Sequence, residues 1–228
     1  MASGVLVIGE SGAGKSTGIE TLNPDETFLI NVANKPLPFK GWKKKYSLYS
    51  KDSNPKGNMI STADPKSIAD CMKYVSSQRP EIKILIVDDW QYMSGFEYMN
   101  RAAEKGYEKF TSISANLGRV ATLPKDLRED LVIVFLTHAE TSQDLEGNTR
   151  LKAKTVGRMI DSALTLEGLF SIVLFAKAKK TKDGIKYIFE TKNDGSNTCK
   201  SPKGMFDTSD IPNDLKFVYD SIVKYEND

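Results

Sequence analysis

The glycine-rich segment GESGAGKS at residues 9–16 constrains the fold more than any other part of this chain. It follows the apolar run GVLVI and precedes STGIETL, which is compatible with a helix. A G-x-x-x-x-G-K-S spacing at a strand-to-helix turn lets backbone N–H groups point at phosphate oxygens, and the helix N-terminus adds positive potential. The segment therefore predicts a sheet protein that binds a nucleoside triphosphate at this turn.

The spacing gives each residue of this phosphate-binding loop an expected role. Lys15 would reach the β- and γ-phosphates, the hydroxyl of Ser16 would bind Mg²⁺, and Thr17 would extend the first helical turn. We therefore expect ATP and Mg²⁺ as cofactors. The residues expected to contact the nucleotide are Gly9, Glu10, Ser11, Gly12, Ala13, Gly14, Lys15, Ser16 and Thr17.

Further apolar, β-branched runs recur along the chain, with helix-compatible stretches between them. Continuous apolar strands that alternate with helices predict an α/β fold with a mainly parallel central sheet, covered by helices on both faces. Strands are expected at 4–9, 27–32, 82–89, 131–138 and 170–180. Helices are expected near 15–22, 64–78, 92–105 and 110–129, the second with Asp64 as its N-cap and Pro65 at its first position.

Two other stretches carry structural expectations. Residues 170–180, the turn TKDG and the run IKYIFETK predict a C-terminal antiparallel hairpin, with Asp183 and Gly184 in the turn. The long polar stretch 139–158 is expected to be a mobile loop. The aromatic and basic segment 37–46 could stack bases or cover a sheet edge, and we favour the structural role.

Length and composition indicate one ordinary domain spanning residues 1–228. Because no apolar run is long enough to cross a bilayer, we expect a cytoplasmic protein with no membrane partner. The net charge of +2 argues against a protein that coats nucleic acid through its overall charge. Cys71 and Cys199 match no metal or redox spacing and are expected to be free thiols.

The run ILIVDD at 84–89 predicts a strand that ends in two carboxylates. Asp88 would hold Mg²⁺ through water. Asp89 could polarise the attacking water, or it could cap the helix expected near Gln91, since neighbouring strand residues point to opposite faces. Both interpretations stay open, and Glu10 and Glu140 are the alternative candidates for the water-activating carboxylate.

His138, the only histidine, follows the apolar run LVIVFLT. A polar residue at the C-terminal end of a central strand lies on the edge where ligands bind in open α/β sheets. We therefore expect His138, together with Thr137, to sense the γ-phosphate and to pass that state to residues 139–158. The alternative is a strand-end histidine that bonds a backbone carbonyl, and we favour the sensor.

Six features carry a family resemblance when they are taken in order: the phosphate-binding loop, the run ILIVDD, the run VIVFLTH, the long polar stretch, the hairpin and the C-terminal stretch TKNDGSNTCKSPKGMF. Together they resemble the RecA-like P-loop ATPase core. More narrowly, they resemble compact phage nucleotide-binding proteins that act as single-strand annealing recombinases. The resemblance covers residues 4 to about 206. It implies a RecA-like fold and a DNA-dependent ATPase that binds single-stranded DNA and promotes annealing or strand pairing in phage recombination.

The resemblance also implies contacts with DNA and with a second subunit. DNA-binding loops would lie at 139–158 and 103–110, with Tyr107 or Phe110 available for base stacking. The residues expected at DNA phosphates are Arg150, Lys152, Lys154 and Arg158. Lys192 and Lys200 match lysines that reach the γ-phosphate of a neighbouring subunit, which implies a homo-oligomeric ring or filament with an ATP site completed in trans. A single-strand-binding protein is a further expected partner.

One departure from the RecA pattern leaves other functions open. That family carries a catalytic glutamate at the end of the strand after the phosphate-binding loop, whereas this chain reads FLINVAN there, without an acid. Hydrolysis would then depend on Asp89 or be slow. A nucleotide-gated binding module with little hydrolysis is one alternative. A small-molecule P-loop kinase is the other, and it is weaker because the six arginines are scattered.

Overall fold

A sheet of nine strands organises the computed structural model, which describes residues 1–143, 147, 149–155, 165–182 and 184–227. Its main path runs β3-β2-β4-β5-β1-β7-β8-β9, and β6 pairs with β5. The strands are β1 (Ser3–Gly9), β2 (Thr27–Asn31), β3 (Met59–Ile60), β4 (Ile84–Asp88), β5 (Val132–Gln143), β6 (Thr149–Ala153), β7 (Ile172–Thr181), β8 (Gly184–Glu190) and β9 (Asp210–Pro212). Neighbouring strands from β3 to β7 are parallel, which confirms the predicted parallel core.

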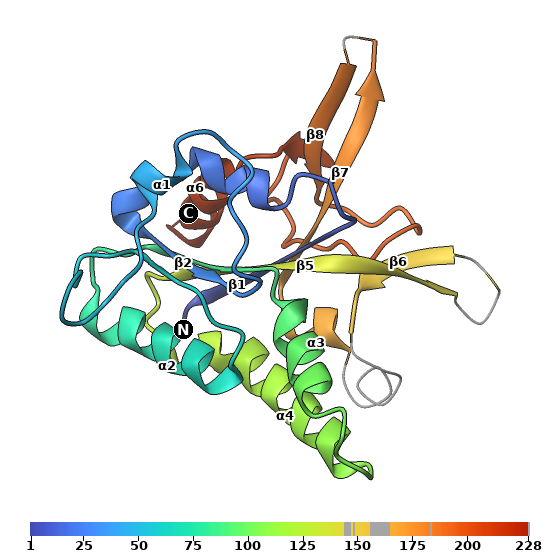
Figure 1. Ribbon diagram of the computed structural model, residues 1–228. Coiled ribbons are helices and arrows are strands. Elements are labelled where there is room, and N and C mark those ends of the chain that lie inside the picture. The colour runs from blue at the N-terminus through green and yellow to red at the C-terminus, as the bar shows by residue number, and fades with distance from the viewer. Residues whose placement is uncertain (144–146, 148, 156–164, 183, 228) are drawn as a thin grey trace.

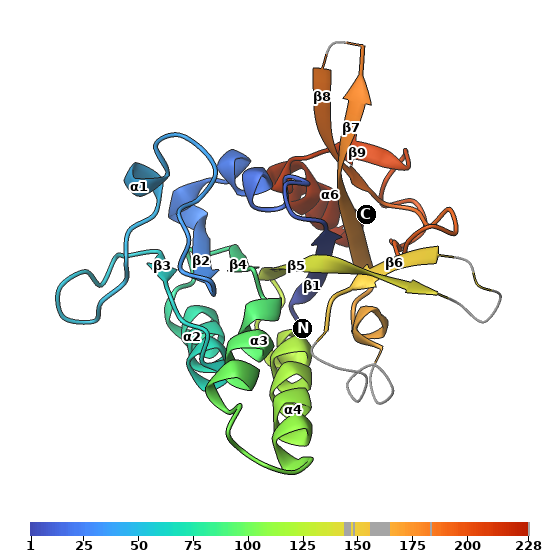
Figure 2. The same cartoon turned by 45° about the vertical axis from the view of Figure 1, so that its right-hand side comes forward.

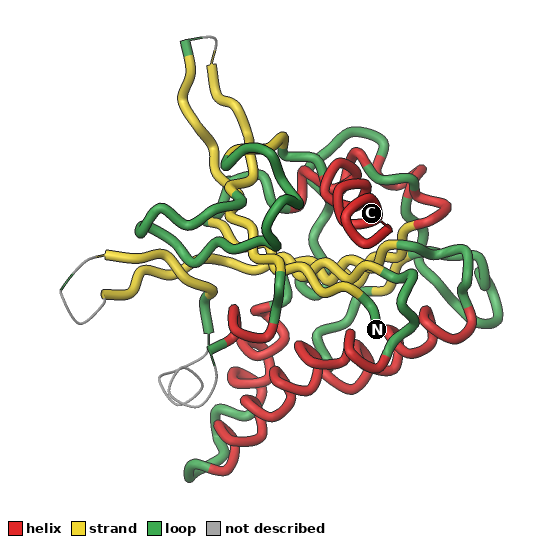
Figure 3. The backbone as a smooth tube through the Cα atoms, turned by 180° about the vertical axis from the view of Figure 1, so that it is seen from behind, coloured by secondary structure: helices red, strands yellow, loops and turns green. Residues whose placement is uncertain are grey.

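Helices cover both faces of this sheet, as Figure 1 shows. The helices α2 (Pro65–Gln78), α3 (Gln91–Asn100) and α4 (Glu108–Thr122) lie on one side, and α1 (Trp42–Lys45) and α6 (Leu215–Asn227) lie on the other. The view from behind in Figure 3 shows the same separation. Short 3-10 helices are η1 (Ser16–Thr21), η2 (Pro24–Glu26), η3 (Leu123–Asp126) and η4 (Leu166–Leu169).

The apolar run of β1 supplies two hydrophobic cores. Leu6 and Ile8 belong to the core that contains residues of α2 and α4, whereas Val5 and Val7 belong to the core that contains residues of α6. All four side chains are fully buried. Because successive strand residues point to opposite faces, only a continuous apolar run satisfies a sheet buried on both sides. Each such side chain stabilises the fold by about 1.5–3 kcal/mol.

The helix α2 begins where the sequence predicts. The carboxylate of Asp64 accepts a hydrogen bond from the backbone N–H of Ser67 at 2.8 Å, and Pro65 occupies the first helical position. Ile68 and Met72, one turn apart, are buried against the sheet. The predicted cap is therefore confirmed.

The other predicted helices differ in type or in length. The stretch expected at 15–22 is the 3-10 helix η1 rather than an α-helix. The helix expected at 92–105 ends at Asn100, and the one expected at 110–129 ends at Thr122. Pro124 explains the second difference, because proline has no N–H to continue an α-helix, and the chain turns into η3 instead.

Two antiparallel arms extend from the sheet (Figure 2). In the first, β7 pairs with β8 down to Thr181 opposite Gly184, which confirms the predicted C-terminal hairpin. Gly184 has a φ of +124°, a conformation that suits glycine in this turn. Asp183, the other predicted turn residue, lies outside the described residues.

The second arm corrects the prediction of a mobile loop at 139–158. The strand β5 continues to Gln143 and pairs with β6, so that Glu140 lies opposite Lys152 and Ser142 lies opposite Arg150. On one face of the arm, Ala153 is buried in the core that contains residues of α2 and α4, and Ala139 and Leu151 pack against that core. This apolar alternation covers only a few residues within a long polar stretch, which as a whole resembles a loop. Residues 144–146, 148 and 156–158 of this stretch lie outside the described part of the chain.

Two further expectations agree with the structure. In the segment 37–46, Phe39 and Tyr46 are buried in the core that contains α6, which supports its structural role. Cys71 and Cys199 are free thiols. Within the described ranges, no helix has the length and apolar character needed to cross a bilayer.

Candidate functional site

Residues 9–17 form the predicted turn between β1 and η1. Gly12 and Gly14 have φ values of +79° and +90°, a region that other L-residues adopt only with strain. Gly9 ends β1, where an added Cβ would lie 2.8 Å from the carbonyl oxygen of Ala176. The glycines of the motif are therefore required by the backbone itself.

A cleft of about 450 Å³ opens over this turn. Of the nine residues expected to contact a nucleotide, Gly9, Glu10 and Ala13 do not line it. The other six line it, namely Ser11, Gly12, Gly14, Lys15, Ser16 and Thr17. Its volume lies within the range of small-molecule and cofactor pockets, roughly 300–1,000 Å³. The cleft is therefore large enough for a nucleotide that has its phosphates on the loop.

The ammonium group of Lys15 is buried beneath the loop. Its Nζ donates to the carbonyl oxygens of Gly9 at 2.8 Å and of Glu10 at 2.9 Å. Burial lowers the pKa of Lys15 to about 8, although the carboxylates of Asp89 and Asp88 act in the opposite direction. A desolvated ammonium of this kind gains stability when an anionic phosphate arrives.

Ser16 and Asp88 connect the loop to the end of β4. The hydroxyl of Ser16 donates to Oδ1 of Asp88 at 2.7 Å. Asp88 is 4% exposed, and burial together with the neighbouring charge of Asp89 raises its pKa to about 6. A carboxylate in this environment is stabilised by a cation at its oxygens.

The donor set of Ser16 and Asp88 fits Mg²⁺. Hydroxyl and carboxylate oxygens are the ligands that Mg²⁺ prefers, and the ion takes its remaining ligands from water and substrate phosphates. In the described part of the chain, no group of three or more acidic, histidine or cysteine side chains forms an all-protein metal cage. Once bound, Mg²⁺ would neutralise phosphate charge.

Asp89 also faces the cleft, because the backbone turns left-handed directly after β4, with φ +57°. Its carboxylate forms an ion pair with Lys35 and lies 3.4 Å from Nε2 of His138. Burial alone would raise the pKa of Asp89, but hydrogen bonds from His138 and Lys35 hold it below its usual value. No side-chain cap bond is made at α3, whose N-cap residue is Trp90. The geometry favours a role in the cleft over the capping alternative.

His138 lies in the wall of the cleft, where its ring contacts the edge of Tyr92 with 6.0 Å between centroids. Its Nε2 faces the carboxylate of Asp89 rather than a backbone carbonyl. The Oε1 atom of Gln91 accepts from the backbone N–H of His138 at 3.2 Å and from the hydroxyl of Thr137 at 3.3 Å. These contacts hold β5 at Thr137 and His138 beside the start of α3.

Of the remaining candidate residues, those that the structure describes do not line the cleft. Lys192 and Lys200 are exposed in the segment between β8 and β9 and do not line it. Glu140 pairs with Lys152 on the β5–β6 arm, with 3.2 Å between their charged atoms. The arm also carries Arg150, and Lys154 follows it directly. Arg158 lies outside the described residues.

Three residues near the nucleotide site carry no sequence signal. Lys35 follows β2 and reaches Asp89. Tyr187 of β8 and Asn213, which precedes α6, lie against the phosphate-binding loop, where a Cβ added to Gly14 would meet them at 2.8 and 3.0 Å. None of the three belongs to a motif, and only the folding of distant segments brings them to the loop.

The arrangement of loop, lysine and serine–carboxylate contact is the one by which P-loop NTPases bind a nucleotide together with Mg²⁺. In fold and site, the chain is a P-loop NTPase. Its family is the AAA domain, whose model matches residues 2–202, and the chain belongs to that family. Membership indicates nucleotide binding and ATPase activity. No curated protein matches the chain.

Proposed function

We propose that this protein is a Mg²⁺-dependent ATPase that binds single-stranded DNA when it holds nucleotide, and that it promotes annealing or strand pairing in phage recombination. It would act in the cytoplasm of the host cell. The nucleotide part of this proposal rests on the cleft and on the family. The DNA part rests on three basic residues of the β5–β6 arm and its end, namely Arg150, Lys152 and Lys154, which we call the basic arm. It rests also on the connection of this arm to the cleft, and on an exposed aromatic residue at the turn between α3 and α4.

The observation that carries the proposal is that β5 connects the cleft directly to the basic arm. His138 lines the cleft, and its carbonyl oxygen accepts from the backbone N–H of Lys154 at 2.8 Å. Arg150 and Lys152 occupy alternate positions of β6, so their side chains leave the same side of the strand, and Lys154 follows directly after it. A change in the cleft wall therefore reaches a row of cations, the kind of surface that follows a nucleic acid backbone.

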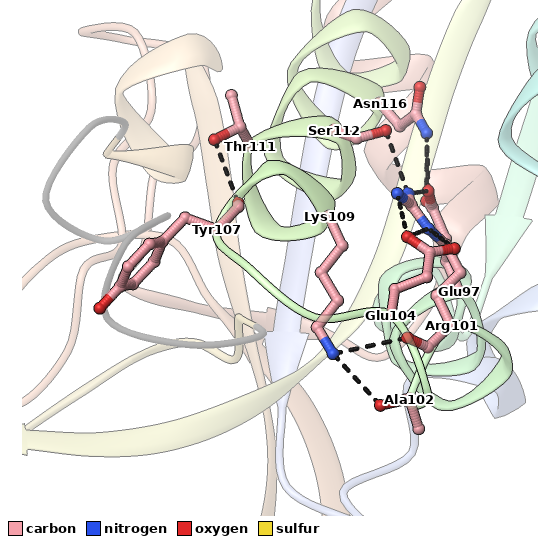
Figure 4. Close-up of polar contacts among 9 residues, drawn as sticks. All are labelled: Glu97, Arg101, Ala102, Glu104, Tyr107, Lys109, Thr111, Ser112 and Asn116. Atoms are coloured by element: carbon pink, nitrogen blue, oxygen red, sulfur yellow. Dashed lines mark hydrogen bonds and ion pairs between the residues drawn. The ribbon is translucent and has the colours of Figure 1, made fainter.

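The turn between α3 and α4 offers a second contact for DNA (Figure 4). Arg101 forms ion pairs with Glu97 at 2.9 Å and Glu104 at 2.8 Å, and Nζ of Lys109 lies 3.4 Å from the carbonyl oxygen of Arg101. These contacts hold the turn, whereas the ring of Tyr107 points away from them and is 76% exposed. A held, exposed aromatic ring suits the stacking of a base.

Phe110, the alternative stacking residue, is less suited to that role. Its ring packs against Tyr98 with 5.8 Å between centroids, and the ammonium of Lys109 lies 5.3 Å from its centre. Because its surface is already partly covered by these neighbours, we assign base stacking at this turn to Tyr107.

Assembly into a ring or filament is the third part of the proposal. Lys192 and Lys200 do not line the cleft of their own subunit, so a role at the γ-phosphate requires a second copy of the chain. A site completed in trans makes ATP binding and assembly favour each other. A single-strand-binding protein would be a further partner on the same DNA.

One observation favours the second candidate, a nucleotide-gated binding module with little hydrolysis. The strand β2 ends in Asn31, whose side-chain amide donates to the carbonyl oxygen of Lys35 at 2.7 Å and whose Oδ1 accepts from the N–H of Lys35 at 3.1 Å. This position therefore shapes a turn and does not present a carboxylate to water.

Phosphate release from ATP, measured with and without a single-stranded oligonucleotide, separates these candidates. Turnover that DNA stimulates, and that Asp89→Asn reduces, supports the ATPase. Nucleotide binding without turnover in either condition supports the gated module. Asp126→Asn, which changes a carboxylate on η3 outside the cleft, is the matched control.

A further inference from the structure

A second cavity, of about 240 Å³, lies beside the nucleotide cleft, and His138 lines both. The helix α3 contributes Tyr92, Phe96 and Met99 to this second cavity, α4 contributes Leu117, and Lys154 comes from the segment after β6. Neither the phosphate-binding loop nor the Ser16–Asp88 pair takes part in it. Its chemistry therefore differs from that of the nucleotide site.

The lining of this cavity is mainly aromatic and apolar. The rings of Tyr92 and Phe96 stack with 5.3 Å between centroids and 29° between planes. Leu117 is 3% exposed, whereas Met99 is 65% exposed. Stacked rings beside an apolar floor favour a flat aromatic ligand, because such rings bind other π-systems in offset-stacked or edge-on arrangements.

Two polar side chains of the lining lack partners within the described structure. They are Gln91, through its Nε2, and Ser94, through its hydroxyl, and both atoms are buried. The orientation of Gln91 is fixed, because its oxygen must face the backbone N–H of His138. Unpaired buried polar atoms are uncommon in folded proteins, so they favour a ligand with polar ring-edge atoms over a plain hydrocarbon.

A positive charge borders the same cavity. Lys154 is exposed and makes no ion pair with any described residue. Arg150 and Lys152 precede it at alternate positions on the basic arm. A ligand that combines a heteroaromatic ring with an attached phosphate would therefore meet the aromatic wall and the cation together.

We propose that this cavity receives one base of a single-stranded DNA chain, with the adjoining phosphate at Lys154. The inference rests on the proposed function, since it names the contact by which the basic arm would hold DNA. The base would stack on the wall of Tyr92 and Phe96 and present its edge to Gln91 and Ser94. Because His138 also lines the nucleotide cleft, base binding and nucleotide binding share one wall.

The test compares two labelled single strands of equal length, one of thymidine nucleotides and one of abasic nucleotides, each titrated by fluorescence anisotropy with a slowly hydrolysed ATP analogue present. The wild type is expected to bind the abasic strand roughly tenfold more weakly. Phe96→Ala should weaken binding of the thymidine strand by a similar factor and leave the abasic strand unchanged. Phe96→Tyr should restore binding.

Phe217→Ala is the matched control, since Phe217 is 42% exposed on α6, on the other face of the sheet. Unchanged ATP affinity and melting temperature would show that each variant is folded. An unaltered thymidine affinity in Phe96→Ala would overturn the base site and leave the proposed function standing. Equal binding of both strands by the wild type would overturn the base site and also the stacking role of Tyr107, while nucleotide-dependent binding through phosphate contacts would still stand. If the wild type binds neither strand, the proposed function fails, and the base site fails with it.

Discussion

Lys35 forms an ion pair with Asp89 in which a half-exposed ammonium meets a carboxylate that is only 4% exposed. Both residues line the nucleotide cleft. The pair offsets part of the negative charge that Asp88 and Asp89 place beside the phosphate-binding loop. Without it, incoming phosphates would meet two buried carboxylates and fewer cations.

Lys35→Ala should therefore weaken ATP binding, by roughly tenfold, because a cation is removed from a partly desolvated cleft. Isothermal titration with MgATP measures the change. Lys40→Ala is the matched control, since Lys40 is an exposed lysine of the same connection that does not line the cleft. Equal affinities of Lys35→Ala and the wild type would contradict this role.

The contact between Ser16 and Asp88 predicts the metal dependence of binding. Ser16→Ala and Asp88→Asn should each lower the gain in ATP affinity that Mg²⁺ provides by about tenfold or more, because the first loses the hydroxyl oxygen of the site and the second loses the negative charge of its carboxylate. Binding of ATP in EDTA should change much less. Glu20→Gln, an acid-to-amide change on η1 outside the cleft, should behave as wild type. An equal loss of ATP affinity with and without Mg²⁺ would contradict a metal site at Ser16 and Asp88.

Substitution of two glycines in the phosphate-binding loop distinguishes the cost of backbone strain from the cost of steric crowding. Gly12→Ala should lower the free energy of unfolding by about 1–2 kcal/mol, the cost of a left-handed conformation, since an added Cβ meets nothing within 4 Å. Gly14→Ala should cost more, because its Cβ would also lie 2.8 Å from Tyr187. Adding Tyr187→Ala should recover part of that difference. Urea unfolding measures all three, and equal losses for the two glycine variants would rule out the crowding.

The cap of α2 predicts a pH-dependent contribution to stability. Asp64→Ala should lower the free energy of unfolding by about 1 kcal/mol at pH 7, whereas Asp64→Asn, which keeps a capping oxygen, should cost less. The hydrogen bonds from Ser67 hold the pKa of Asp64 below its usual value, so the charged cap contributes fully above about pH 4. The gap between wild type and Asp64→Ala should narrow as the pH falls below that. A gap that stays constant down to pH 2 would contradict the assignment.

If a lysine of a second subunit completes the ATP site, its substitution should affect ATP hydrolysis and not ATP binding. Lys192→Ala should leave ATP affinity unchanged and lower the rate of hydrolysis, because Lys192 lies outside the cleft of its own subunit. Lys203→Ala, another exposed lysine of the same connection, is the control. Normal hydrolysis by Lys192→Ala would remove Lys192 from the active site and leave Lys200 as the candidate.

The parts of the fold that could be predicted are those that one stretch of sequence determines. The loop at 9–16 requires left-handed glycines, and the apolar runs require a sheet buried on two faces, so the amino-acid pattern alone indicates both. Lys35 could not be predicted, because it reaches Asp89 only once β2 lies beside β4 and Asn31 has bonded the turn. The β5–β6 arm could not be predicted either, since its apolar alternation is limited to a few residues, such as Leu151 and Ala153, within a long polar stretch that resembles a loop.

The central claim is that nucleotide in the cleft controls binding of single-stranded DNA. Anisotropy of a labelled single-stranded oligonucleotide, titrated with the protein with and without a slowly hydrolysed ATP analogue, tests it most directly. The account predicts tight binding only with the analogue, and loss of that binding in Lys15→Ala. Binding that is equal with and without nucleotide, or absent in both conditions, would contradict it.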